Sequence, residues 1–377
     1  MHEVDVLVVG GGPAGLSAAI VLAGCELKTL VCEQKRLPVD KPCGEGLMPT
    51  GLADLDRLAV KRHLAKGDYF PFSGIRYIAP SGQAVQAAFK EGPGWGIPRP
   101  NLSAALLRRA LEIDGLEIRQ DAPVRPGDRL KDGRILANVG GEPVAARLLV
   151  GADGLNSSVR RWAGLQGRPQ PRQRWGARQH FRIHPWSEYV EVYWKGGLEA
   201  YITPCGEQLV GVAFLWDRKR YPRLPGGKDL IPCLLAAFPE LKARLERASP
   251  NDVPRAIGPL QRTVTGPVAD GVLLIGDAGG YLDALTGEGI SLATAQALAL
   301  AETVAPRLRM AQGPCLSKQD LTAYAHASQV ITRPYYRLTR LALFLSRHPA
   351  LVDGAIRLLA RQPELFQRLL SANMGLA

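Results

Sequence analysis

The sequence lacks any long apolar run. Its 377 residues contain no window of about 18 or more that is both apolar and free of charge, although a membrane-spanning helix needs about 20 such residues. The first residues also lack the basic stretch and cleavage site of a signal peptide, because their apolar run leads directly into glycines. We therefore expect no spanning helix and a cytoplasmic location, either free or peripheral to a membrane.

Cysteine is scarce and scattered. The six cysteines lie at positions 25, 32, 43, 205, 233 and 315, with no C-x-x-C pair among them. In a chain of this length, that spacing is typical of reduced thiols rather than of a disulfide framework or a zinc site. The six histidines are also dispersed. We therefore expect no metal site, and no Ser/His/Asp set or paired-carboxylate site is apparent.

Acidic residues are fewer than basic ones. The chain has 35 Asp and Glu against 47 Lys and Arg, which gives a formal net charge of +12. We expect no nucleic-acid partner, because the basic residues form no tight run interleaved with aromatic residues. The excess positive charge instead suits anionic small molecules or an anionic membrane surface.

The motif that organises the chain lies near its start. Residues 4–9, rich in valine, are predicted to form a buried parallel strand, and residues 16–23 a helix. Between them, Gly10, Gly12 and Gly15 have the spacing Gly-x-Gly-x-x-Gly. This spacing allows a tight turn, a close approach to a pyrophosphate and close helix–strand packing. The free N–H groups and the dipole of the helix favour phosphate binding there.

A second predicted strand, residues 29–33, ends in an acidic residue, Glu33. It lies about 20 residues beyond the glycines, where a carboxylate can accept hydrogen bonds from the ribose of an adenine dinucleotide. The sequence thus predicts a dinucleotide site. Its candidate residues are Gly10, Gly12, Pro13, Ala14, Gly15, Glu33 and Gln34.

Two later apolar segments are also predicted strands that end in glycine and aspartate. One ends in Gly151-Ala152-Asp153-Gly154 and the other in Gly276-Asp277-Ala278. Between them, residues 178–216 have the alternation of an antiparallel sheet. We infer one discontinuous cofactor domain with a substrate sheet inserted into it.

Local signals predict several smaller elements. We expect helices over residues 52–66 and 102–112, the second with Asn101 as its N-cap. Strands are expected over 116–119 and 134–139, around a hairpin turn.

The three motifs, in this order, resemble the flavoprotein superfamily of p-hydroxybenzoate hydroxylase, which also contains geranylgeranyl reductases and flavin-dependent halogenases. The resemblance covers residues 1–310 and implies FAD as the bound cofactor. It implies that Asp277, which follows Gly276, contacts a ribitol hydroxyl, that Asp153 and Gly154 lie near the pyrophosphate, and that Arg99 lies near the cofactor. We nevertheless expect Asp153 to be mainly a structural turn.

The resemblance implies a fold of the α/β class. This is a Rossmann-like FAD-binding fold of the p-hydroxybenzoate hydroxylase type, with an inserted antiparallel β-sheet substrate domain and a helical C-terminus. The expected boundaries are residues 1–70, 98–165 and 255–310 for the FAD-binding domain, 71–97 and 166–254 for the substrate sheet, and 311–377 for the C-terminal helical segment.

Two loops resemble the reductase and halogenase branches more narrowly. Residues 41–46 are similar to a loop whose Cys-Gly pair lies near the flavin. Residues 285–290 are similar to a Thr-Gly-x-Gly-Ile motif, in which glycines open a helix whose N–H groups and dipole can stabilise reduced flavin. The cofactor contacts implied by the two loops are Cys43, Gly44, Gly287, Glu288, Gly289 and Ile290.

The candidate catalytic residues are Cys43, Glu45 and Glu288. Glu45 and Glu288 flank the expected flavin face, so either could donate a proton. Alternatives stay open for all three: Cys43 as a small buried hydrophobe, and the two carboxylates as solvated loop residues.

The resemblance leaves several functions open. We expect first a hydroxylase-type monooxygenase, in which reduced FAD reacts with oxygen and its C4a-hydroperoxide transfers one oxygen atom. The alternative is a geranylgeranyl-reductase-like enzyme that passes hydride from FAD to a carbon–carbon double bond. A third hypothesis is a flavoprotein that acts as a maturation or electron-relay partner. Residues 199–204 lack the tryptophans of the halogenase motif, which counts against halogenation, and keep little of the reductase motif.

The substrate and the electron donor are only broadly indicated. No second Gly-x-Gly-x-x-Gly is present, so NAD(P)H is expected as a transient donor. Tyr193, Tyr201 and Phe214 on the inserted sheet are candidate substrate contacts, with ordinary sheet core as the alternative. They suggest a small apolar or aromatic substrate, either free or bound to a carrier or a lipid.

The last residues form a basic amphipathic segment. We expect two or three helices over residues 331–370, interrupted near Pro334, Pro349 and Pro363. They could close the substrate pocket as a cap. They could also dock on an anionic membrane, because a basic helix with Leu and Phe on one face suits such contact.

Overall fold

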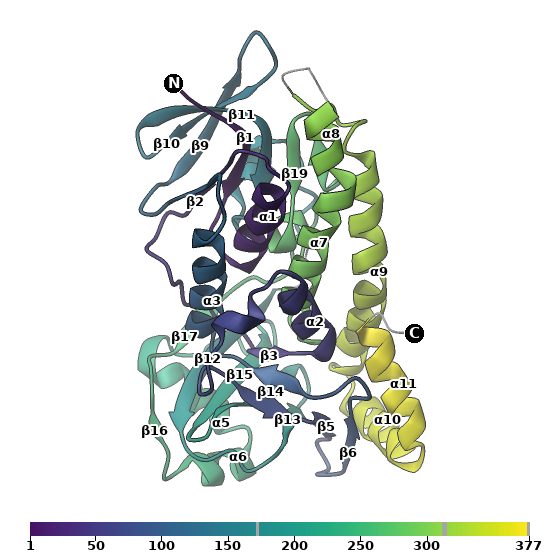
Figure 1. Cartoon of the computed structure of the whole chain (residues 1–377). Coiled ribbons are helices and arrows are strands. Elements are labelled where there is room, and N and C mark those ends of the chain that lie inside the picture. The colour runs from purple at the N-terminus through teal and green to yellow at the C-terminus, as the bar shows by residue number, and fades with distance from the viewer. Residues whose placement is uncertain (171–172, 311–314, 375–377) are drawn as a thin grey trace.

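The computed structural model describes residues 1–170, 173–310 and 315–374 (Figure 1). Two large sheets lie one above the other in this view, and the C-terminal helices run down one side of both. The mixed α/β architecture and the helical C-terminus agree with the fold class expected from the sequence.

The first sheet is built on the N-terminal strand. Strand β1 pairs in parallel with β2 and β11, β2 pairs in parallel with β8, and β11 pairs in parallel with β19. Runs such as Val6–Val9 are buried on both faces, as expected for a parallel sheet covered by helices. The order is β18-β19-β11-β1-β2-β8, with bounds β1 (His2–Val9), β2 (Thr29–Cys32), β8 (Leu116–Arg119), β11 (Glu142–Gly151), β18 (Val268–Ala269) and β19 (Val272–Leu274).

A hairpin extends this sheet. β10 (Ile135–Val139) pairs with β11 and with β9 (Val124–Arg129), a strand that the sequence did not predict. Only one residue of β9, Val124, contributes to the neighbouring apolar cluster, and the others are mostly polar. The apolar alternation that marks a strand is therefore missing.

Helices cover the first sheet. Helix α1 (Pro13–Gly24) lies against α7 (Gly289–Thr303) and α3 (Arg99–Leu111), and α2 (Pro49–Arg57) packs on α7. A short helix, α4 (Ser158–Trp162), follows β11, and α8 (Ala305–Met310) follows α7.

Two helix predictions are wrong at their ends. The helix expected over 52–66 ends at Arg57, where the chain turns through Ala59 with φ of 55°. Helix α3 begins at Arg99, because Pro100 suits the first turn. Asn101 therefore lies inside the helix rather than at its N-cap, and its side-chain amide donates to the carbonyl of Asp68 at 3.0 Å.

The second sheet has the order β16-β12-β15-β14-β13-β5-β6, and β17 also pairs with β12. It gathers strands from residues 74–88 and 174–257, and one pair, β13 with β5, is parallel rather than antiparallel. The bounds are β5 (Gly74–Ile78), β6 (Ala84–Ala88), β12 (Arg174–Arg182), β13 (Tyr189–Trp194), β14 (Leu198–Gly206), β15 (Leu209–Asp217), β16 (Ser249–Pro250) and β17 (Arg255–Ile257).

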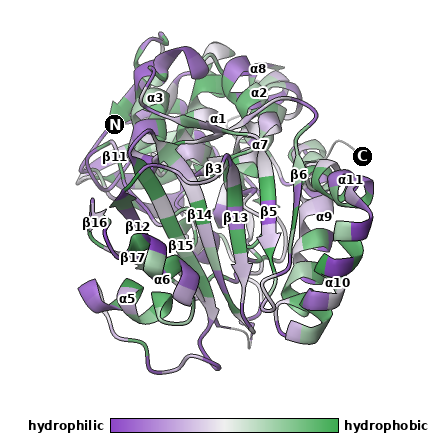
Figure 2. Ribbon diagram, turned by 90° about the horizontal axis from the view of Figure 1, so that it is seen from below, coloured by the Kyte–Doolittle hydropathy of each residue, from purple (hydrophilic) through white to green (hydrophobic). Residues whose placement is uncertain are grey.

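The two faces of the second sheet differ. Helices α5 (Leu230–Leu235) and α6 (Pro239–Leu245) form an apolar cluster with one face, and Figure 2 shows them in front of β12 and β15. The other face is turned toward the first sheet. A small sheet of β3 (Gly46–Leu47), β7 (Gly94–Gly96) and β4 (Phe70–Phe72) joins that side.

Three helices end the described chain: α9 (Thr322–Leu345), α10 (Pro349–Arg361) and α11 (Pro363–Asn373). Helix α9 packs on α7, whereas α10 and α11 pack on β6. The expected interruption at Pro334 is wrong, because α9 continues through this proline. Of the helices described here, none is long and apolar enough to cross a membrane.

Candidate functional site

The glycine turn between β1 and α1 is built by backbone contacts. Gly10 has φ of 107°, and a Cβ there would lie 2.5 Å from the carbonyl oxygen of Ala152. A Cβ on Gly15 would lie only 1.8 Å from the carbonyl oxygen of Gly10. Gly12 differs, since its Cβ would meet nothing nearer than Arg99 Nη2, at 3.8 Å. Gly10 and Gly15 are thus required by the fold, and Gly12 keeps the backbone accessible beside Arg99.

Charged groups surround this turn. The buried carboxylate of Glu33, which we expected to accept from a ribose hydroxyl, accepts a hydrogen bond from the Gly11 N–H at 2.8 Å. The buried Nε of Arg99 has no hydrogen-bond partner in the described part of the chain. A guanidinium beside a helix N-terminus suits a pyrophosphate. The residues present therefore fit FAD.

Lys41 was not among the predicted cofactor residues, although it begins the Lys-Pro-Cys-Gly segment. Its Nζ lies 3.9 Å from the position of a Cβ on Gly154. Burial lowers the pKa of Lys41, while the carboxylates of Glu33 and Asp277 act in the opposite direction. Lys41 thus adds a second cation-capable group, after Arg99, to the predicted phosphate region.

The two motif aspartates have different surroundings. Asp277 opens the short turn after β19, and burial raises the pKa of its carboxyl despite the nearby charges of Lys41 and Arg99. Asp153 instead accepts hydrogen bonds from the Ser158 N–H at 2.6 Å and from the Ser158 hydroxyl at 2.9 Å. These bonds hold the turn into α4, in line with the structural role that we expected for Asp153.

Two loops approach the second sheet from the cofactor domain. In the first, the Cys43 Sγ accepts from the Glu45 N–H at 3.3 Å, and burial raises the pKa of the thiol. The carbonyl of Gly44 accepts from the Thr203 hydroxyl on β14 at 2.8 Å. In the second loop, the carbonyl of Leu285 accepts from the Tyr201 hydroxyl at 2.6 Å.

Glu288 is the buried acid of the second loop. It is the N-cap residue of α7, directly between Gly287 and Gly289, and only 3% of it is exposed. Burial raises the pKa of its carboxyl to about 8, so the group is largely protonated at neutral pH. The alternative of a solvated loop carboxylate is therefore wrong for Glu288.

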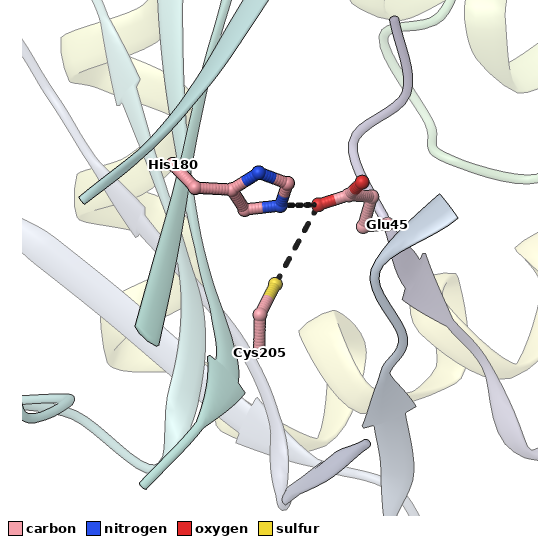
Figure 3. A group of neighbouring side chains, drawn as sticks. All are labelled: Glu45, His180 and Cys205. Carbon is pink, nitrogen blue, oxygen red and sulfur yellow. Dashed lines mark hydrogen bonds and ion pairs between the residues drawn. The ribbon is translucent and has the colours of Figure 1, made fainter. Parts of the chain in front are cut away.

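Glu45 belongs to a second buried cluster, shown in Figure 3. Its Oε2 lies 2.5 Å from His180 Nε2 and accepts from the Cys205 thiol at 3.7 Å. On the other side of the imidazole, Nδ1 lies 2.8 Å from Asp252 Oδ2. Burial alone would lower the pKa of His180, but the two carboxylates outweigh it and raise the pKa to about 9. The histidine is therefore a cation at neutral pH.

Donor atoms of Glu45, His180 and Cys205 lie within 4.8 Å of one another, a spacing that also occurs in metal sites. The 2.5 Å contact between the imidazole and the carboxylate has the geometry of a charge-assisted hydrogen bond. The wholly buried guanidinium of Arg178 lies 3.4 Å from Glu45 and 3.1 Å from His180, where it would repel a further cation. This arrangement favours a proton over a metal ion.

Another buried ion-pair network lies on the face of the second sheet that carries His180. Arg174 donates to Glu199 at 2.5 Å and to Asp283 at 2.8 Å, and all three residues are buried. Burial raises the pKa of Glu199 to about 7, against the opposing effect of Arg174.

The sequence analysis did not predict Arg174, Arg178, His180 or Cys205. A signal for the first three was present, because they lie two or four residues apart on β12 and therefore face the same side of the sheet.

The predicted substrate residues separate onto two faces. Tyr201 faces the 285–290 loop. Tyr193 and Phe214 face α5 and α6, where both rings pack near Phe238. This packing favours the alternative of ordinary sheet core for Tyr193 and Phe214, because the alternation of a strand places them on the face that packs against α5 and α6.

Comparisons with known proteins agree with these features. The family described as "FAD binding domain" matches residues 3–197. A menaquinone reductase of Mycobacterium tuberculosis is 30% identical over 308 residues, which cover 76% of this chain and 72% of that protein. Digeranylgeranylglycerophospholipid reductase 1 of Methanothermobacter thermautotrophicus is 28% identical over 312 residues, which cover 76% and 73%.

Two solved structures have the same fold. A flavoprotein/dehydrogenase from Cytophaga hutchinsonii gives a TM-score of 0.84 at 17% identity, covering 99% of this chain and 93% of that one. A protein described as a probable FAD-dependent monooxygenase, from Pseudomonas aeruginosa, gives 0.74 at 20% identity, covering 94% and 99%. At these identities the likeness concerns the fold alone.

Proposed function

This chain belongs to the FAD-binding-domain family, within the superfamily of p-hydroxybenzoate hydroxylase, and from that premise we propose that it reduces carbon–carbon double bonds in the polyprenyl chain of a lipid. That it is an FAD-dependent oxidoreductase follows from the family. The choice of reaction is supported by the names of two relatives, a menaquinone reductase and a digeranylgeranylglycerophospholipid reductase. The chain spans most of the length of both.

The observation that carries this proposal is the buried carboxyl of Glu288 at the N-terminus of α7, whose pKa is raised to about 8 by burial. When bound, FAD in its reduced form supplies a hydride. Saturating a double bond also requires a proton, so that one π bond breaks and two C–H bonds form. Glu288 is buried and keeps its proton at neutral pH, and it lies in the loop that the family resemblance places beside the flavin. It donates the proton and regains one from solvent after the reaction.

The surroundings of this loop suit a hydrocarbon. Leu282 and Leu285 belong to an apolar cluster that also contains Tyr77, Tyr201 and Phe366. The cluster joins the second sheet to the C-terminal helices and offers few polar groups. The electron donor that we propose is NAD(P)H, which would bind transiently.

The outer face of the C-terminal helices suits a lipid surface, and we propose that the enzyme meets its substrate there. Figure 2 shows apolar and polar residues mixed along α10 and α11. The exposed apolar side chains of this C-terminal surface include Leu341, Phe344, Leu351, Leu358, Leu365 and Leu369. Its exposed arginines include Arg337, Arg340, Arg357, Arg361 and Arg368. Leucines for the acyl boundary and arginines for anionic headgroups are what interfacial binding requires.

The opposite side of the same helices is buried. Tyr335, Leu343, Val352, Ile356 and Phe366 pack into the apolar cluster beneath. The helices thus also cover the second sheet, as in the cap expected from the sequence. Covering the sheet and contacting a membrane use different faces and are compatible.

An anaerobic reaction tests the proposed chemistry. The FAD-loaded protein is reduced with dithionite, freed of excess reductant and mixed with a geranylgeranyl lipid without oxygen. We expect the flavin to reoxidise while the lipid gains two hydrogen atoms, as measured by mass spectrometry. Reoxidation that requires oxygen and adds one oxygen atom to an apolar or aromatic compound would instead identify the hydroxylase-type reaction. If neither product forms, the hypothesis of a maturation or electron-relay partner would remain.

A further inference from the structure

The loop of residues 40–46 is tied to the second sheet by charged side chains. Arg178 on β12 bonds to Asp40 at one end of the loop and lies 3.4 Å from Glu45 near the other end. Arg255 on β17 also donates to Asp40, at 2.5 Å. Cys43 lies between these two anchored positions. The sheet therefore fixes the loop on both sides of the thiol.

Glu45 also connects this network to the predicted cofactor site. Its Oε2 bonds to His180, while its Oε1 accepts from the backbone N–H of Arg99 at 2.9 Å. Arg99 is the residue whose guanidinium lies beside Gly12. One carboxylate thus joins β12 to the first turn of α3.

The backbone at Glu45 is unusual. Its φ is 61°, in the left-handed region, although the residue is neither glycine nor asparagine. Such a conformation is unfavourable for a residue other than glycine and persists only where the surroundings hold it. Opposite the carboxylate, a Cβ on Gly211 would approach Cys205 Sγ at 3.2 Å and Glu45 Oε2 at 3.3 Å. The left-handed backbone at Glu45 and the absence of a side chain at Gly211 together allow the carboxylate to occupy this position.

We propose that Glu45 and His180 are positioning residues that form a charge clamp, which holds Cys43 and Arg99 in register with β12 and β14. Glu45 is one of the two residues, with Glu288, that we expected as possible proton donors. Its carboxylate is instead engaged by His180 and Arg178. The inference rests on the predicted FAD site but not on the reductase chemistry, because loop position and FAD affinity are measurable without turnover.

Thiol labelling tests the clamp directly. Peptide mass spectrometry follows the alkylation of Cys43 by iodoacetamide at pH 7.5, with the exposed Cys233 as internal reference. Glu45→Gly removes the carboxylate and relieves the left-handed backbone, and His180→Gln removes the charge at similar size. We expect each to speed Cys43 labelling about tenfold through local opening, and to weaken FAD binding measured by flavin fluorescence.

A double variant and a matched control complete the experiment. Because both residues act in one contact, the Glu45→Gly/His180→Gln variant should label no faster than the faster single variant. Leu241→Ala removes a buried side chain behind the sheet and should lower the melting temperature without changing Cys43 labelling. Glu45→Gln keeps the shape and is the alternative if the glycine variant does not fold.

The pH dependence gives a second readout. The charged groups that face His180 are Glu45 and Asp252, with Arg178 and the Cys205 thiol adjacent. The pKa of His180 is about 9, so FAD affinity should fall as pH rises through about 9 in the wild type and not in His180→Gln. Unchanged labelling, equal pH profiles, or strictly additive effects of the two substitutions would each overturn the clamp and leave a purely structural contact.

Discussion

Arg174 on β12 bonds to Asp283 at 2.8 Å, which connects the second sheet to the loop that leads into α7. Tyr201 on β14 holds the same loop through the carbonyl of Leu285. Elsewhere on the same face of the sheet, Arg178 and His180 on β12 hold the loop that contains Cys43 through their contacts with Glu45. The two strands therefore position both loops that the family resemblance places beside the flavin.

Removing Arg174 should destabilise the fold strongly. Arg174→Ala leaves the carboxylates of Glu199 and Asp283 buried without their cation, and breaking a buried pair in this way costs roughly 3–5 kcal/mol. Urea unfolding followed by circular dichroism measures the loss. Arg36→Ala is the control, because the pair of Arg36 with Asp121 is exposed and should contribute little. Equal effects of the two substitutions would contradict the assignment of Arg174.

Two glycines of the first turn should respond differently to alanine. Gly15→Ala places a Cβ 1.8 Å from a backbone oxygen and should prevent stable folding. Gly12→Ala meets no protein atom nearer than 3.8 Å, so the chain should fold with little change in melting temperature. It should nevertheless lose FAD, because the Cβ occupies the approach of the pyrophosphate. A Gly12→Ala protein that purifies with a full complement of flavin would contradict this location of the cofactor.

Substitutions of the two motif aspartates, Asp277 and Asp153, should also have different effects. Asp277→Ala should weaken FAD binding by roughly 1.5–3 kcal/mol, about 10- to 150-fold, because a charged hydrogen bond is lost in a dry site. Asp153→Ala should mainly lower stability, since it removes the acceptor for Ser158 at the start of α4. Fluorescence titration with FAD gives both dissociation constants, and equal values would count against the role of Asp277.

The sequence predicts the cofactor half of the molecule well, for a physical reason. A turn as tight as that of Gly15 can be formed by few sequences, because only glycine fits there. The spacing between the glycines and Glu33 follows from the length of a strand–helix–strand unit. These features are local. The fold class and the FAD-binding family could therefore be named from three short segments.

The face of the second sheet was harder to predict because its contacts join distant segments. His180 meets Glu45 across 135 positions, and Arg174 meets Asp283 across 109. No local pattern specifies those pairings. Alternation along β14 and β15 predicts which residues share a face, but only the packing of α5 and α6 shows that Phe214 lies on the outer face.

The rate of double-bond reduction should depend on the protonation of Glu288. The acid form donates, so the rate should be constant at lower pH and fall as pH rises through about 8. Glu288→Gln should lower the rate at neutral pH by about 100-fold or more and remove this limb of the profile. Single-turnover flavin reoxidation across pH 6–10 measures both, with FAD affinity as the control for correct folding. A Gln variant with the wild-type rate would exclude Glu288 as the proton donor.

Membrane contact can be tested on the C-terminal surface without cutting the chain. Shortening the protein to residue 330 would divide α9 and remove Tyr335 and Leu343, which would expose the apolar cluster that these two buried residues help to form. Substitutions of surface residues avoid this problem. Leu341 and Phe344 are 52% and 55% exposed on α9, whereas Leu111, on α3, is 68% exposed at a distant position and serves as the control.

The full chain should sediment with phosphatidylglycerol vesicles at low salt and be released by high salt. Salt screens the electrostatic attraction between the arginines and the anionic surface. Leu341→Glu/Phe344→Glu should weaken this binding by about tenfold or more, since each variant side chain loses its apolar contact and adds a repelled charge. Leu111→Glu should bind as the wild type does. If the full chain ignores anionic vesicles at low salt, the C-terminal helices serve only to cover the second sheet, and the lipid substrate must be delivered by a carrier.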